Sequence, residues 1–195
     1  MRTVVVLASL GAALIAAPQT STPDAEGFIR NWLILAPIAI EGESGAAAID
    51  VPFLDNEAGV KPKPGDTVVI GSKPLSWKPH QSSEYLIDFL KAFPERGEYV
   101  AAYAVAYVHA EQDMKVTLAL STNDQGKAWV NGKEVFKFAE TRTLEKDTDK
   151  VDVALVKGPN VVMLKVVNEV NNWQACARFL ANGTPVTNLK ISLTP

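Results

Sequence analysis

The chain has 195 residues, with 19 Lys and Arg against 22 Asp and Glu and a formal net charge of -3. A slightly acidic chain lacks the basic excess that neutralises phosphates, so nucleic acid is not an expected partner. The single Cys excludes a disulfide within the chain, a Cys-rich zinc site and a Cys-ligated iron–sulfur cluster. The length suffices for one well-filled hydrophobic core.

The first 17 residues have the pattern of a secretory signal peptide. Arg2 supplies a positive charge, residues 4–17 are uncharged, and the small Ala16 and Ala17 precede a proline. The stretch is shorter than the roughly 20 apolar residues of a membrane-spanning helix, so no permanent membrane anchor is expected. We predict a secreted protein, extracellular or periplasmic, with cleavage after Ala17 and a flexible lead-in over residues 18–27.

The next segments alternate between strand-like and loop-like composition. Residues 28–35 are rich in β-formers and end before Pro37, which predicts a strand that stops there. Residues 41–64 carry several Gly and Pro, which predicts a long surface connection with a short helix near residues 46–54. Residues 99–110 are apolar on both faces, which favours a central strand covered on both sides.

The second half of the chain has a period of two. In residues 114–121 the even positions are apolar and the other face is polar, which predicts a strand with one buried and one wet face. Residues 162–167 place Lys165 toward solvent, and residues 173–179 place Trp173 in the core. The dipeptide at 131–132 is Asn-Gly, which tolerates the positive φ of a two-residue hairpin turn.

About eight short strands without a sustained helical pattern predict an all-β protein. The expected architecture is an antiparallel β-sandwich that forms a single domain over residues 28–195. In such folds the loops gather at the two ends of the sandwich, so a binding site is expected there.

One stretch resembles a known family. Residues 121–135 read STNDQGKAWVNGKEV, similar to the S-x-D-D-x-x-K-V-W-L-N-G-K-x-V segment of galactose-binding-like jelly-roll modules of secreted bacterial proteins. Residues 99–104, residues 157–166 and the pair Trp173 and Arg178 resemble other strands of those modules. The resemblance covers about residues 28–193 and implies a jelly-roll sandwich. Modules of this kind bind carbohydrate or calcium in some members and support a neighbouring catalytic domain in others.

The residues offer little for catalysis. A hydrolytic triad needs a His beside a nucleophile, and His80 and His109 are expected in structural or solvent roles. Cys176 has no His near it in sequence and is interpreted as an inert thiol. No acidic pair stands out among the 22 carboxylates for glycoside hydrolysis. We therefore expect no enzymatic activity.

Tryptophan rings stack on sugars, while amides bond sugar hydroxyls, so loop residues of these types are the candidate ligand-binding residues. These candidates are Trp77, Trp129, Asn131, Asn171, Asn172 and Trp173. Exposure is expected for Trp77 in a loop and for part of Trp129 near the hairpin. Core packing is the stronger interpretation for Trp173, as it is for Trp32.

Two groups of oxygen ligands make calcium a candidate cofactor, and no other cofactor is expected. Asn123 and Asp124 lie in the family-like stretch, where an Asx-turn is the favoured alternative. Acidic residues at 145, 147, 149 and 152 form the second group, more typical of a solvated loop. The Asn-Gly-Thr sequence at 182–184 is a glycosylation sequon or a hairpin turn.

Three functions follow in order of preference. The first is a non-catalytic secreted module that binds carbohydrate or polysaccharide, or serves as an accessory domain. The second is a structural or assembly subunit of an extracellular or cell-surface structure, which contacts protein neighbours or copies of itself through an exposed apolar face. The third is a glycan-acting enzyme.

Overall fold

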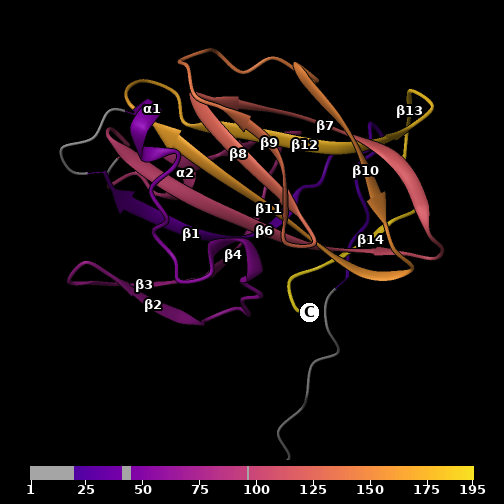
Figure 1. Ribbon diagram of the computed structural model, residues 1–195, viewed down its shortest axis with the longest axis horizontal. Coiled ribbons are helices and arrows are strands. Elements are labelled where there is room, and N and C mark those ends of the chain that lie inside the picture. Colours follow the sequence, from indigo (N-terminus) through magenta and orange to yellow (C-terminus); the bar gives the residue numbers. More distant parts are fainter. Residues whose placement is uncertain (1–19, 41–44, 96) are drawn as a thin grey trace, which may run out of the picture.

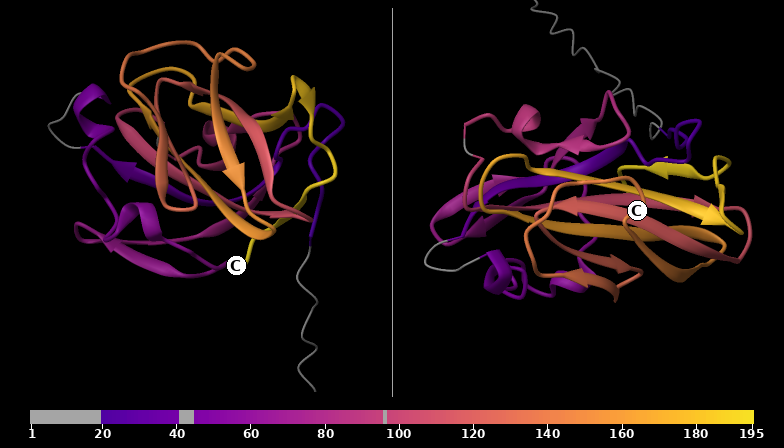
Figure 2. Two further views of the ribbon diagram at one scale, coloured as in Figure 1. Left: turned by 45° about the vertical axis from the view of Figure 1, so that its right-hand side comes forward. Right: turned by 90° about the horizontal axis from the view of Figure 1, so that it is seen from above.

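The computed structural model describes residues 20–40, 45–95 and 97–195, whose strands form two antiparallel sheets packed as layers (Figure 1, Figure 2). The larger sheet has seven strands. In spatial order these are β4 (Lys78–Gln81), β1 (Asn31–Ala39), β6 (Val100–Ala110), β11 (Gly158–Asn168), β8 (Gln125–Val130) and β9 (Lys133–Phe138), with β14 (Lys190–Ser192) also paired to β6.

The smaller sheet has five strands, and a separate ribbon of two strands lies beside the larger sheet. The smaller sheet consists of β10 (Asp149–Leu155), β7 (Met114–Asn123), β12 (Gln174–Ala181) and β13 (Thr184–Pro185), with β5 (Ile87–Asp88) also paired to β12. The ribbon consists of β2 (Thr67–Ile70) and β3 (Lys73–Ser76).

Helices are short in the part of the chain that the structure describes. They are α1 (Gly45–Ala48), α2 (Phe89–Ala92) and the 3-10 turn η1 (Glu57–Gly59). The Asp88 carboxylate caps the N-terminus of α2 by accepting a hydrogen bond from the Lys91 amide at 3.1 Å. The all-β antiparallel sandwich predicted from the sequence is confirmed.

The main core lies between the two sheets and follows the predicted alternation. Val162, Leu164 and Val166 of β11 point into it, and Trp173 and the odd positions of β12 meet them from the smaller sheet. Strand β6 has neighbours on both sides and is buried along nearly its whole length, so the prediction of a central strand is confirmed.

A second apolar cluster covers the outer face of the larger sheet. Residues 45–62 run across this face and bury Ile49 and Leu54 against Tyr103, Trp129 and other residues of the sheet. The expected surface connection is therefore a covering layer, hereafter the cover segment. Its helix is also shorter than expected, since α1 has four residues. Apolar side chains at intervals in a Gly- and Pro-containing segment explain why it packs on the sheet.

Pro37 does not end the first strand. Strand β1 continues to Ala39, and its register with β6 shifts between Leu35 and Ile38. Because proline lacks an amide hydrogen, a break in the hydrogen-bond ladder is the place where a strand can hold it. The strand also begins later than predicted: Phe28 forms an isolated bridge with Arg178 of the other sheet.

Part of the predicted lead-in is attached to the sandwich. The amide of Ser21 donates to the carbonyl of Ile191 at 2.9 Å, and the amide of Ile191 donates back at 2.7 Å. The predicted signal peptide, residues 1–17, lies outside the described residues. No helix among those described is long and apolar enough to cross a membrane.

The Asn-Gly hairpin is confirmed and has a near duplicate in the chain. Asn131 and Gly132 join β8 to β9 with φ of 52° and 81°, and Asn182 and Gly183 join β12 to β13 with φ of 50° and 79°. The turn interpretation of the sequon at Asn182 is thus confirmed. The Asn131 side chain also accepts from the Val161 amide and donates to Asn160, each at 2.8 Å.

Replacing each asparagine with alanine should distinguish the contribution of the turn conformation to stability from that of the side-chain hydrogen bonds. Both variants place alanine at a positive φ, but only Asn131→Ala also loses two hydrogen bonds. We expect Asn131→Ala to lower the free energy of unfolding by about 1–3 kcal/mol more than Asn182→Ala does, at about 0.5–1.5 kcal/mol per bond. Urea denaturation measures the difference. Equal losses would contradict a stabilising role for the Asn131 amide.

Candidate functional site

The described residues enclose a pocket of about 690 Å³ at one end of the sandwich. It forms where the β8–β9 hairpin of the larger sheet meets β7, β10 and the end of β12 in the smaller sheet. Its lining residues are Lys115, Val116, Thr117, Val130, Asn131, Lys133, Val135, Asp152, Val153, Ala154, Leu180 and Asn182. The volume lies within the range of small-molecule sites, and apolar lining with a few polar groups is typical of them.

The polar groups of the pocket differ in how far they are already engaged. Thr117 donates its hydroxyl to Asp152 at 2.9 Å across the β7–β10 pair. The Asn131 amide is held by its bonds to the neighbouring strand. Lys115, Lys133 and Asn182 are exposed and have no side-chain partner among the described residues. These three groups are free to bind a ligand.

The tryptophans expected to face a ligand are buried. Trp77 and Trp129 are 3% and 4% exposed, so the prediction of their exposure is wrong. The cause is the cover segment, because both rings belong to the cluster beneath it. The core interpretation of Trp173 and Trp32 is confirmed, since both are 0% exposed. Trp173 packs on Phe89 with ring centroids 4.9 Å apart and donates its ring NH to the Val166 carbonyl at 3.3 Å.

The candidate asparagines do not form one site. Asn131 lies at the pocket, beside the beginning of β11. Asn171 and Asn172 are exposed in the loop that follows the other end of the same strand. At about 3.3 Å per residue, the length of β11 separates them by more than about 20 Å. The structure thus places one of the predicted ligand residues at the pocket and two at the opposite end of the sandwich.

The calcium candidates Asn123 and Asp124 are buried and serve the backbone. Asp124 accepts from the amides of Arg142 at 3.2 Å and Glu169 at 3.3 Å. Asn123 donates its side-chain amide to the Arg142 carbonyl at 2.8 Å, and its Oδ1 has no partner. Burial raises the pKa of Asp124, although the two amide bonds oppose the shift. Asp124 thus bonds distant backbone amides.

Two of the four acidic residues at 145, 147, 149 and 152 pair with arginines. Asp147 accepts from Arg178 at 2.9 Å, and Asp149 accepts from Arg142 at 2.5 Å. Across the described ranges, no group of three or more His, Cys, Asp and Glu side chains could hold a metal ion. Calcium binding therefore stays a prediction, and the described residues show no cluster of ligands that supports it.

The two histidines and the cysteine occupy structural positions. His109 lies 2.8 Å from the Ser192 hydroxyl, which itself donates to the Thr194 carbonyl at 2.7 Å. His80 lies in strand β4, opposite Trp32, instead of in the predicted loop, and burial lowers its pKa. Because the serine hydroxyl is committed to a carbonyl, this pair does not have the arrangement of an activated nucleophile.

Cys176 should be unreactive in the folded protein. It is 1% exposed on the outer side of β12, and burial raises the pKa of its thiol to about 12. The thiolate is the reactive form, so its fraction near pH 8 falls on the order of a thousandfold below that of an ordinary cysteine. Ellman's reagent should label it at pH 8 only after unfolding in guanidinium. Rapid labelling of the native protein would contradict this burial.

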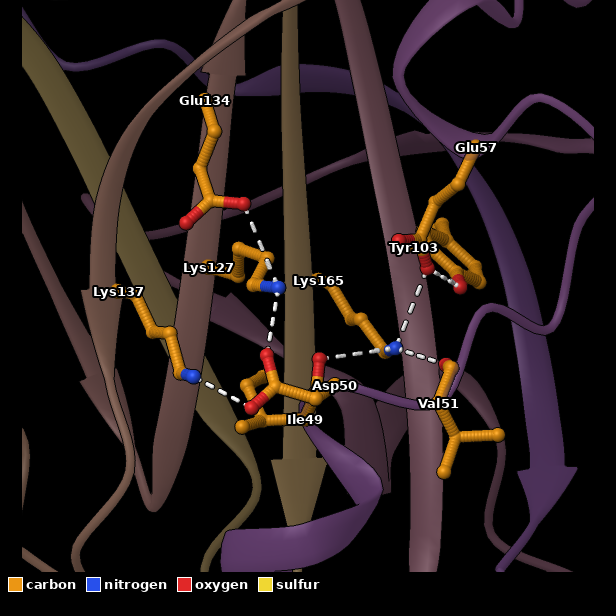
Figure 3. A network of polar contacts seen from close by, with 9 residues as sticks. All are labelled: Ile49, Asp50, Val51, Glu57, Tyr103, Lys127, Glu134, Lys137 and Lys165. Carbon is orange, nitrogen blue, oxygen red and sulfur yellow. Dashed lines mark hydrogen bonds and ion pairs between the residues drawn. The ribbon is translucent and has the colours of Figure 1, made fainter.

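A network of charged side chains lies beneath and beside the cover segment (Figure 3). Lys165 of β11, predicted to face solvent, is 0% exposed, so that prediction is wrong. Its ammonium donates to the carbonyls of Ile49 and Val51 at 3.1 and 2.5 Å and to Glu57 at 3.1 Å. Burial lowers its pKa, and Glu57 opposes that shift. Glu57 also accepts from the Tyr103 hydroxyl.

A second part of the network lies at the rim of the cover segment. Asp50 accepts from Lys127 at 2.9 Å and also from Lys137, and Lys127 lies 3.4 Å from Glu134 (Figure 3). The bonds with Lys127 and Lys137 lower the pKa of Asp50 to about 2. The ammonium of Lys165 has three hydrogens and three acceptors, all of them in residues of the cover segment. The network is therefore suited to holding the cover segment on the sheet, and the Lys165 amine is engaged in hydrogen bonds instead of being a free nucleophile.

Comparisons with known proteins assign no family. No model of a protein family matches the sequence. No curated protein matches it either. The fold is similar to part of a solved GH31 alpha-xylosidase from Xanthomonas citri, at 11% sequence identity and a TM-score of 0.36. The match covers 91% of this chain and 18% of the xylosidase, so the chain spans less than a fifth of that protein.

Proposed function

We propose that the protein is a non-catalytic exported module of galactose-binding-like type, which binds carbohydrate in the pocket between β7, β9 and β10. The observation that supports this is the pocket of about 690 Å³, with valines in its wall and polar groups among them. Its apolar surface can pack on the C–H groups of a sugar, while Asp152, Thr117 and Asn182 bond hydroxyls.

The single carboxylate of the pocket supports a binding role over hydrolysis. Canonical glycoside hydrolysis uses two carboxyl groups about 5–10 Å apart, one of them a general acid. Asp152 is the one acidic residue among the lining residues. A single aspartate that already accepts a hydroxyl hydrogen suits hydrogen bonding to a sugar better than acid–base chemistry.

A glycan array followed by isothermal titration calorimetry of the best ligand tests the proposal. Asp152→Ala should weaken binding by about tenfold, the loss of one or two hydrogen bonds from a charged group. Asn171→Ala with Asn172→Ala changes the opposite end of the sandwich and is the matched control, expected to bind as the wild type does. If the control variant loses binding while Asp152→Ala keeps it, the ligand lies at the other end. Failure of every glycan would overturn the proposal.

Assembly with protein neighbours or further copies is the second candidate function. Tyr99 and Val170 are 48% and 42% exposed, and the Tyr99 amide bonds the carbonyl of Glu169, next to Val170. Two exposed apolar side chains at one end of the sandwich favour a protein contact there. Light scattering at increasing concentration should then show assembly that Tyr99→Ser with Val170→Ser abolishes. A monomer at all concentrations would exclude self-assembly.

A further inference from the structure

Two lysines approach the pocket from different sheets. Lys115 is the second residue of β7 in the smaller sheet, and Lys133 is the first residue of β9 in the larger sheet. Neither has an ion-pair or hydrogen-bond partner in the described ranges of the chain, and both are exposed. By contrast, Lys127, Lys137 and Lys165 each lie within ion-pair distance of a carboxylate. Among the described residues, the two lysines of the pocket thus carry charges that no carboxylate pairs with.

The one acid of the pocket does not neutralise them. Asp152 lies opposite Thr117 on the neighbouring strand and accepts its hydroxyl hydrogen, and no ion pair joins it to a lysine in the described residues. The charged lining therefore consists of two ammonium groups and one carboxylate, a net charge of one positive unit. This positive excess favours an anionic ligand, and because both lysines are exposed, salt should weaken the preference.

We infer that the pocket selects a glycan with an anionic substituent, held between Lys115 and Lys133. This inference rests on the proposed carbohydrate function and names the class of ligand. The anion accepts charge-assisted hydrogen bonds from the two ammonium groups, while Asp152 and Asn182 bond hydroxyls of the same sugar. The chemistry fits the carboxylate of a uronic acid and equally a sulfate ester, and the two sources are distinguished by the probes below.

The test is calorimetric titration with three matched probes: an oligogalacturonate, the same oligosaccharide as its methyl ester, and a sulfated galactan oligosaccharide. The free acid should bind at least about tenfold more tightly than the neutral ester if both lysines contact the carboxylate. Stronger binding of the sulfated probe would assign the site to a sulfate ester. The preference for an anion should also fall as salt rises from 50 to about 300 mM, because ions screen the lysines.

Substitutions of the two lysines test whether they are the source of the preference for an anionic probe. Lys115→Gln and Lys133→Gln should each lower affinity for the preferred anionic probe by about three- to tenfold and leave binding of the neutral ester unchanged. Lys73→Gln on the distant β2–β3 ribbon is the matched control and should change neither. Equal affinity for the acid, its ester and the sulfated probe would overturn the anionic inference while the carbohydrate function stands. Absence of binding to these probes and to every neutral glycan would overturn both.

Discussion

Replacing Lys165 with methionine should lower the free energy of unfolding by about 3–5 kcal/mol, the usual loss when one partner of a buried pair is removed. Methionine preserves much of the side-chain volume, so the loss comes from polar atoms that remain without a donor. These are the carbonyls of Ile49 and Val51 and the carboxylate of Glu57, which the buried ammonium now satisfies.

Lys137→Met is the matched control for this experiment. Lys137 belongs to the same network, but its side chain is 38% exposed, so its pair with Asp50 should contribute no more than about 1 kcal/mol. Guanidinium denaturation of both variants, followed by tryptophan fluorescence, gives the comparison. Equal stability of the two variants would mean that the cover segment does not depend on the Lys165 contacts.

Trp173→Ala should be the most damaging change in the main core, with an expected loss of about 3–5 kcal/mol. The ring is fully buried between the sheets, packs on Phe89 and donates its NH to the Val166 carbonyl. Removing the ring leaves a cavity and takes away its hydrogen bond to that carbonyl. Trp173→Phe should lose less than half as much, because it keeps an aromatic ring against Phe89.

Val69→Ala provides the exposed reference for the tryptophan variants. Val69 is 71% exposed on the β2–β3 ribbon, so its truncation should change stability by no more than about 0.5 kcal/mol. Thermal unfolding monitored by circular dichroism measures all three variants. A mild effect of Trp173→Ala would show that the end of the sandwich tolerates a void and would contradict the close packing around this ring.

The alternation of apolar residues predicted which side chains lie between the sheets, because successive side chains of a strand point to opposite faces. Val162, Leu164 and Val166 were assigned to the core in this way, and Asn131 with Gly132 marked a turn through backbone chemistry alone. The same alternation assigned Lys165 to solvent. It identifies the outer face of a strand but carries no information about a distant segment that packs on that face, and residues 45–62 do so here.

The pocket was beyond sequence reasoning for a related reason. Its wall combines side chains from strands β7, β10 and β12 of one sheet with side chains from β8 and β9 of the other, which meet only after the two sheets pack. Aromatic residues in loops are a general signal for sugar binding, and that signal pointed to Trp77 and Trp129, which the cover segment buries. Asn131 was the one predicted ligand residue that reached the pocket, because the hairpin that holds it was itself predictable.

The bridge between Ser21 and Ile191 determines how the domain responds to a stretching force. The two residues pair in antiparallel fashion, so the chain before Ser21 and the chain after Ile191 leave from the same end of the bridge. A pull on residues 20 and 195 therefore opens this pair as a zipper, one hydrogen bond after the other, instead of loading several bonds in shear. Strand β14 would be peeled from β6 next. Under tension the domain yields first at its ends, before the strands that form the main core are loaded.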